Sequence, residues 1–83
     1  MIWNKVGFVV ASKQRIEVFL LLKECSNIEE IKQKIKQTSV NGVERILRDF
    51  VKEGLVVLDN SNVRLTELGK EVMEKVSEMR FSL

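Results

Sequence analysis

The sequence contains no histidine and only one cysteine, Cys25. A single cysteine cannot form a disulfide within the chain, and a zinc site of the usual Cys/His type needs further ligands. The chain also lacks a Gly-rich phosphate loop and a nucleophile placed beside a base. We therefore expect a protein that is not an enzyme and that uses no metal and no other cofactor.

Long apolar segments are also absent. No run approaches the roughly 20 residues that span a bilayer, and the short apolar stretch at residues 6–11 does not have the pattern of a signal peptide. Hydrophobic residues make up 45% of the 83 residues and charged residues 31%, which is typical of one globular domain. We expect a soluble, cytoplasmic protein with no membrane partner.

The spacing of apolar residues predicts four helices, at residues 13–24, 28–36, 40–53 and 67–80. Each predicted helix follows a residue type that caps helix N-termini, namely Ser12, Asn27, Ser39 and Thr66. The first of these helices is too apolar for a surface helix, so we expect it to be buried on two sides. Gly54 stands where a left-handed residue would end the third helix.

The remaining segments favour extended structure. Residues 2–11 are rich in Val, Phe and Trp, which predicts an extended arm or a short strand. Residues 55–58 and 63–65 predict two strands around a turn at residues 59–62. The order helix, helix, turn, helix, hairpin, helix predicts a winged helix-turn-helix, an α+β fold that is mainly α. We expect a single domain, residues 1–83, with an arm (1–11), a winged-helix core (12–66) and a C-terminal helix (67–83).

Three motifs carry a resemblance to a known group of proteins. They are Ser12-Lys13-Gln14-Arg15-Ile16 before an apolar helix, Phe50-Val51-Lys52-Glu53-Gly54-Leu55-Val56, and Leu65-Thr66-Glu67-Leu68-Gly69-Lys70. With these motifs, residues 12–76 resemble small archaeal and bacterial winged-helix transcription regulators of the ArsR and MarR type. The resemblance implies double-stranded DNA as the partner.

In a helix-turn-helix, the second helix lies in the DNA major groove. The candidate DNA-binding residues on and before the third predicted helix are Ser39, Val40, Asn41, Glu44, Arg45 and Arg48. Asn41 suits adenine, Arg45 suits guanine, and Val40 can pack on a thymine methyl group. The alternative is a solvated helix face with an ion pair between Arg45 and Asp49.

Six further basic residues are candidates for phosphate contacts, and two of them, Lys13 and Arg15, stand at the start of the first predicted helix. Lys32, Lys34 and Lys36 belong to the second predicted helix, and Arg64 is the basic residue of the hairpin. The alternative for the three lysines is a solvated charged face. Arg64 fits a position at the minor groove or a position that covers the sheet.

An apolar stripe on the last helix suggests self-association. The candidate interface residues are Trp3, Phe8, Leu68, Val72, Val76 and Met79. The stripe would otherwise pack on the helix at residues 13–24, but so small a domain has little core to cover it, and exposed apolar patches usually mark an interface. We therefore expect a homodimer held by the terminal segments.

These observations favour a homodimeric, sequence-specific DNA-binding regulator of transcription. Residues 38–54 carry three acidic and three basic side chains, so the charge of this segment does not itself select DNA. The alternative function is a winged-helix module for protein–protein interaction in a transcription or replication assembly.

Overall fold

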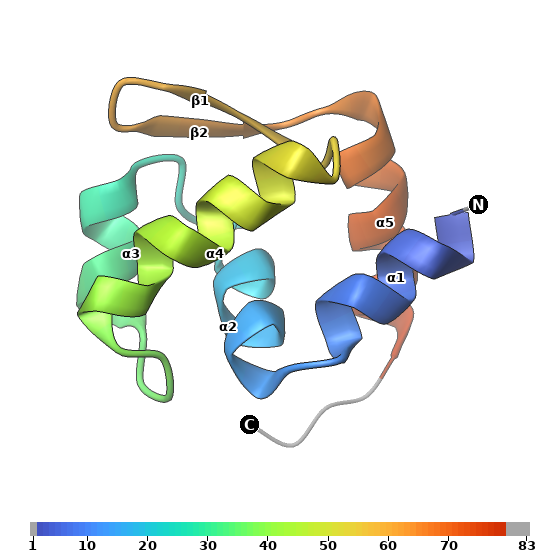
Figure 1. Cartoon of the computed structure of the whole chain (residues 1–83), viewed down its shortest axis with the longest axis horizontal. Helices are drawn as coiled ribbons and strands as arrows, with labels where there is room; N and C mark the ends of the chain where they lie inside the picture. The colour runs from blue at the N-terminus through green and yellow to red at the C-terminus, as the bar shows by residue number, and fades with distance from the viewer. Residues whose placement is uncertain (1, 80–83) are drawn as a thin grey trace.

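The computed structural model describes residues 2–79 of the chain. The elements follow in the order α1 (Ile2–Val10), α2 (Lys13–Leu21), α3 (Ile28–Lys34), α4 (Val40–Lys52), β1 (Val56–Asp59), β2 (Asn62–Leu65) and α5 (Glu67–Glu78). In Figure 1, α2 lies in the middle, with α3 on one side and α1 and α5 on the other, and α4 runs diagonally past α2 from α3 toward α5. The predicted α+β, mainly helical class is confirmed, as is a hairpin before the C-terminal helix, and the arrangement is compatible with a winged helix.

Four of the helices begin where the sequence predicted, because the side chain before each one caps its N-terminus. The side chains of Ser12, Asn27, Ser39 and Thr66 each accept a hydrogen bond from a backbone N–H two or three residues further on. Such bonds satisfy amides that the first helical turn leaves without a partner. Gly54 has φ +76°, so the predicted left-handed residue after α4 is also confirmed.

The hairpin is part of a slightly larger sheet-like arrangement. β1 and β2 are antiparallel, with Val56 opposite Leu65 and Asp59 opposite Asn62. On the other side of β2, Asn27 forms an isolated bridge with Asn62, and Val63 N–H donates to the carbonyl of Ser26 at 2.8 Å. These contacts tie the hairpin to the loop before α3.

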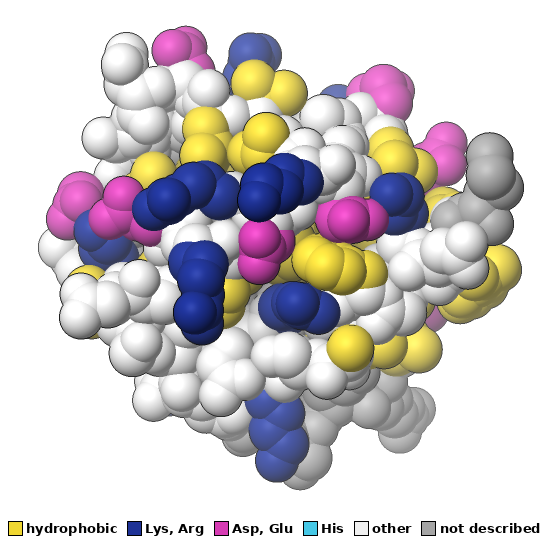
Figure 2. All heavy atoms as spheres, viewed as in Figure 1, with side chains coloured by type: hydrophobic (Ala, Val, Ile, Leu, Met, Phe, Trp, Pro, Cys, Tyr) yellow, Lys and Arg dark blue, Asp and Glu magenta, His cyan; other side chains and the backbone are white. Residues whose placement is uncertain are grey.

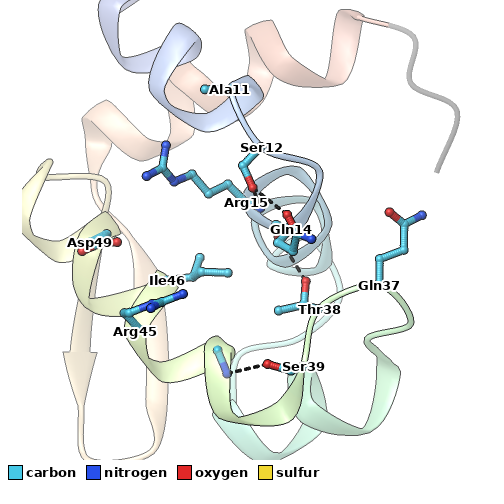
Figure 3. Close-up of a pocket in the computed structure, with 11 residues that line it drawn as sticks. Ala11, Ser12, Gln14, Arg15, Gln37, Thr38, Ser39, Arg45, Ile46 and Asp49 are labelled. Carbon is cyan, nitrogen blue, oxygen red and sulfur yellow. Dashed lines mark hydrogen bonds between the residues drawn. The ribbon is translucent and has the colours of Figure 1, made fainter.

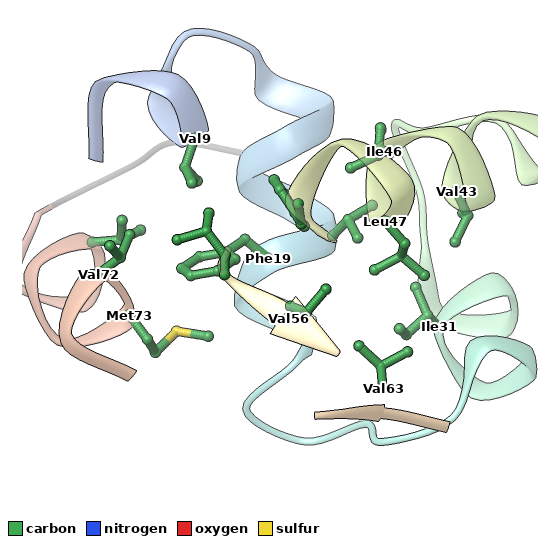
Figure 4. Close-up of a cluster of buried hydrophobic side chains, with 14 of the residues drawn as sticks. Val9, Phe19, Ile31, Val43, Ile46, Leu47, Val56, Val63, Val72 and Met73 are labelled. Atoms are coloured by element: carbon green, nitrogen blue, oxygen red, sulfur yellow. The ribbon is translucent and has the colours of Figure 1, made fainter. Parts of the chain in front are cut away.

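The core is centred on α2, which packs against α1, α3, α4 and α5. Phe19 of α2 and Phe50 of α4 are fully buried and meet edge to face, with ring centroids 5.4 Å apart. Figure 4 shows Val72 and Met73 of α5 on one side of Phe19 and Leu47 and Ile31 on the other. The expectation that the helix predicted at residues 13–24, now α2, is buried on two sides is confirmed.

Residues 2–10 form helix α1, so the prediction of an extended arm or short strand was wrong. Ile2, Val6 and Val9 have the i, i+4, i+7 spacing of one helix face, and Val6 and Val9 are buried at 2% and 0% exposure. α1 packs along α5 and on α2. The apolar surface that these helices offer outweighs the preference of valine for strands, because such preferences depend on packing.

The packing of α1 also changes the role of the stripe on α5. Val72 and Val76 are both 0% exposed and belong to the core of the single chain. They therefore cannot contact a second copy of the chain. For these two residues the structure agrees with the alternative interpretation, in which the stripe packs within the chain. None of the described helices is long and apolar enough to cross a membrane.

Candidate nucleic-acid interface

The two faces of α4 differ sharply. Val43, Ile46, Leu47 and Phe50 are buried in the core, and the opposite face carries the exposed residues Val40, Asn41, Glu44, Arg45, Arg48 and Lys52. The predicted DNA-reading residues of this helix thus lie together on its solvent face. Ser39, at the start of the helix, accepts a hydrogen bond from Gly42 N–H at 3.2 Å.

The turn between α3 and α4 is held by a carboxylate from α2. Glu17 accepts hydrogen bonds from the backbone N–H groups of Lys36 (2.6 Å), Gln37 (3.1 Å) and Thr38 (2.9 Å). It also accepts one from the Thr38 hydroxyl at 2.8 Å. Because these amides turn toward Glu17, α3 ends at Lys34, two residues before the predicted end.

Sequence reasoning missed Glu17 as an organising residue. The sequence feature that could have identified Glu17 is its position between Ile16 and Val18, where a carboxylate interrupts a run of apolar residues. Burial by itself would raise the pKa of Glu17, but the hydrogen bonds from Lys36, Thr38 and Gln37 favour the charged form and hold its pKa below the usual 4.5. The carboxylate is therefore ionised at neutral pH and fixes α3 and α4 relative to α2.

Two acidic side chains in and next to α4 are paired with other helices. Glu44 Oε2 lies 3.0 Å from Lys32 Nζ of α3, and Glu53 Oε1 lies 2.8 Å from Lys5 Nζ of α1. The hydrogen bond from Lys32 lowers the pKa of Glu44, and the same bond raises the pKa of Lys32. Lys32 and Glu44, both predicted to contact DNA, are thus brought into contact with each other.

Apart from the paired carboxylates, the charged side chains on the solvent face of α4 are basic. Within residues 2–79, Arg45, Arg48 and Lys52 form no ion pair, and the proposed pair of Arg45 with Asp49 is not formed. Figure 2 shows Lys and Arg side chains gathered over α4, with acidic side chains between and beside them. The segment is neutral in sequence, but its carboxylates are partly neutralised by lysines from other helices, which leaves arginines on the solvent face.

A pocket of about 800 Å³ opens between the start of α2, the α3–α4 turn and the first turns of α4. Figure 3 shows Arg15, Gln14 and Arg45 around it, with Ser39 at its edge. The guanidinium of Arg15 lies 4.1 Å from the centre of the Phe8 ring and donates to the carbonyl of Phe8 at 3.0 Å. Two arginines and two small hydroxyl residues, Ser12 and Ser39, suit an anionic group such as a phosphate, although the acidic side chain of Asp49 also lines the pocket.

The other predicted phosphate contacts do not join this pocket. Lys34 is 3.5 Å from Glu24, Lys36 is exposed beside the turn, and Arg64 lies on β2 opposite Val57. Arg15 is the predicted phosphate contact that lines the pocket, whereas the sequence did not indicate that the uncharged side chains of Gln14 and Thr38 would line it as well.

The predicted interface residues divide into two groups. Trp3 and Met79 are exposed, at 61% and 41%, and the Lys75 ammonium lies 5.9 Å from the centre of the Trp3 ring. Phe8 and Leu68 are half-buried and pack against the core, where Phe8 meets Phe50 edge to face. Arg80 and the rest of the predicted C-terminal segment lie outside the described residues.

Comparisons of this chain with protein-family models, with curated proteins and with solved structures found no match.

Proposed function

We propose that this protein is a winged-helix regulator of transcription that binds double-stranded DNA by placing α4 in the major groove. The order of the helices and the hairpin supports this function, as does the exposure of one whole face of α4. An α-helix fits the major groove of B-DNA, and the N-terminal residues of a recognition helix reach the base edges.

The observation that carries the proposal is the distribution of charge on α4. Lys32 binds Glu44 and Lys5 binds Glu53, whereas Arg45 and Arg48 form no ion pair with any residue from 2 to 79. Arginines available on an exposed helix attract phosphates and can read guanine with two hydrogen bonds. The same pairing reduces the repulsion between Glu44 and a phosphate backbone.

The residues of the first turns of α4 have distinct roles in this arrangement. Asn41 would pair with adenine, Arg45 with guanine, and Val40, which is 51% exposed, would pack on a thymine methyl group. The pocket between Arg15 and Ser39 would hold a backbone phosphate and so fix the register of α4 on the duplex.

We further propose that two copies pair through the surface formed by α1 and the end of α5. Trp3 and Met79 are large hydrophobic side chains that remain exposed there, and exposed apolar patches often mark interfaces. This surface belongs to other elements than α4, so pairing would leave both α4 helices free. A two-fold axis would then present them to half-sites about 34 Å apart.

The experiment is a titration of the protein against a mixed-sequence DNA duplex at several salt concentrations, followed by selection of bound duplexes from a random pool. DNA binding predicts an affinity that falls steeply with salt and an enriched motif. On that motif, Arg45→Ala should cost about 1–3 kcal/mol of binding free energy and relax the preference at one base position.

Lys70→Ala is the matched control, because Lys70 is an exposed cation on α5 that pairs with Glu67 at 3.2 Å. It removes the same charge from another side of the molecule and should change affinity little. Equal losses for Arg45→Ala on all sequences would make Arg45 a phosphate contact. An affinity that does not respond to salt or to Arg45→Ala would contradict the proposed docking.

A further inference from the structure

A second surface lies beside the DNA-reading half of α4. A groove of about 570 Å³ runs between the C-terminal half of α4 and β1. Its lining residues are Arg48, Val51, Lys52, Gly54, Val56, Val57, Leu58 and Thr66. Val51 and Val57 are 40% and 43% exposed, although both are large aliphatic side chains. In Figure 2, hydrophobic side chains are visible beside the basic side chains that lie over α4.

The backbone of β1 presents an open edge. Thr66 N–H donates to the Leu55 carbonyl at 3.0 Å, so Leu55 and Thr66 occupy a hydrogen-bonded position of the antiparallel ladder, although Leu55 N–H itself donates to the Phe50 carbonyl. Hydrogen-bonded pairs alternate along such a ladder, which means that the N–H and C=O groups of Val56 and Leu58 point away from β2. Within residues 2–79, no backbone hydrogen bond joins Val56 or Leu58 to a segment on that side.

The charge beside the groove has one sign. Arg48 and Lys52 lie one helical turn apart along its α4 side, and none of the lining residues is acidic. A strand edge offers backbone hydrogen bonds, aliphatic walls accept an aliphatic side chain, and two cations attract carboxylates. A DNA duplex has phosphates for the cations, but it has no peptide backbone to extend a β-sheet.

We propose that this groove binds an extended, acidic segment of a partner protein, which adds to β1 as a third strand of the hairpin. Aliphatic side chains of that segment lie against Val51 and Val57, and its carboxylates face Arg48 and Lys52. The interaction shares Arg48 with the proposed DNA-binding face, but it otherwise uses the C-terminal half of α4 and the edge of β1 rather than the first turns of α4.

The probe is a synthetic heptapeptide of alternating glutamate and valine, titrated into the isotope-labelled protein and followed by NMR. Strand addition predicts shifts at β1 and slower hydrogen exchange of the Val56 and Leu58 amides. The same peptide with N-methylated backbone amides should not bind, because it cannot donate the ladder hydrogen bonds. Binding of the N-methylated peptide, or unchanged exchange at Val56 and Leu58, would overturn the proposal.

Substitutions separate the groove from the DNA-reading surface. Val57→Glu should weaken peptide binding by at least about tenfold, because it places a carboxylate among those of the peptide. Val40→Glu changes another exposed valine, at the start of α4, and should leave peptide binding unchanged. Equal effects of the two variants would contradict the proposed position.

A charge exchange tests the cations without altering the strand. Lys52→Glu should weaken binding of the glutamate peptide and strengthen binding of the corresponding lysine peptide. If Lys52→Glu changes the affinity for neither peptide, Lys52 does not contact the charged side chains of the bound segment. A result in which only a DNA duplex, and no peptide, perturbs the Val56 and Leu58 amides would assign the groove to DNA instead.

Discussion

Glu17 and Thr38 join the middle of α2 to the turn before α4, since the Glu17 carboxylate accepts both the backbone N–H and the hydroxyl of Thr38, at 2.9 and 2.8 Å. Thr38 is 7% exposed and Glu17 9%. Buried donors that lose their acceptor cannot turn to water, so the loss of one partner costs more than the bond itself contributes. This pair therefore helps to hold the turn before α4 on α2.

The first prediction concerns the stability that this contact provides. Glu17→Gln keeps the shape of the side chain but replaces one carboxylate oxygen, which accepts hydrogen bonds, by an NH₂ group that faces backbone N–H donors. We expect it to lower the free energy of unfolding by about 2 kcal/mol, the range of hydrogen bonds to a charged group. Denaturant unfolding measures this change. Glu74→Gln, at an exposed position on α5, is the control and should be close to wild type.

The second prediction is a pH dependence of the same effect. The pKa of Glu17 is lower in the folded protein than its usual 4.5. The contribution of the charged carboxylate to the free energy of unfolding is therefore fully present above pH 4.5, and it is lost as the pH falls through the folded-state pKa. The difference in unfolding free energy between wild type and Glu17→Gln should be constant near neutral pH and narrow below about 4.5. A difference that stays constant into strong acid would contradict this account.

Local signals account for the parts of the fold that sequence reasoning predicted. The caps at Ser12 and Ser39 and the left-handed Gly54 depend on a few neighbouring residues, which a sequence shows directly. The role of Glu17 depends on amides 19 to 21 residues away in the chain. Its contacts follow from the packing of α2 against α3 and α4, which no local pattern records.

The two largest differences from the sequence-based predictions share one cause. Residues 2–11 have strand-favouring side chains, and Val72 and Val76 form a stripe that resembles an interface. Both features are explained once α1 packs on α5, because each helix then buries the apolar face of the other. The pairing of Lys32 with Glu44 likewise requires the crossing of α3 and α4. Contacts between distant segments thus decided what periodicity alone left open.

The third prediction contrasts two helical glycines. A Cβ atom at Gly69 would overlap the carbonyl oxygen of Leu55, whereas one at Gly7 would meet nothing within 4 Å. Gly69→Ala should therefore lower the unfolding free energy by roughly 3 kcal/mol, because the backbone at Leu55, directly before β1, cannot move away cheaply. Gly7→Ala should raise it by about 0.5–1 kcal/mol, since alanine restricts the unfolded chain.

Thermal unfolding of the two variants decides between packing and a general effect of alanine in helices. Melting temperatures that shift in the same direction would contradict the close approach of α5 to the residues that follow α4.

Gly54→Val offers an independent measurement at the end of α4. Its φ of +76° strains a β-branched residue, so we expect a loss of about 1–2 kcal/mol.

The last prediction is that the protein forms a dimer through Trp3 and the exposed end of α5. Lysine at the buried positions Val72 or Val76 would unfold the chain, so these positions cannot test the interface. Trp3 is 61% exposed, and Trp3→Lys should release monomers while the unfolding free energy of the single chain changes little. Val40→Lys introduces the same charge on α4 and should leave the dimer intact. Analytical ultracentrifugation at micromolar concentration measures both. A wild-type mass near 9.6 kDa would refute the dimer, and a dimer that survives Trp3→Lys together with Met79→Lys would place its interface away from α1 and α5.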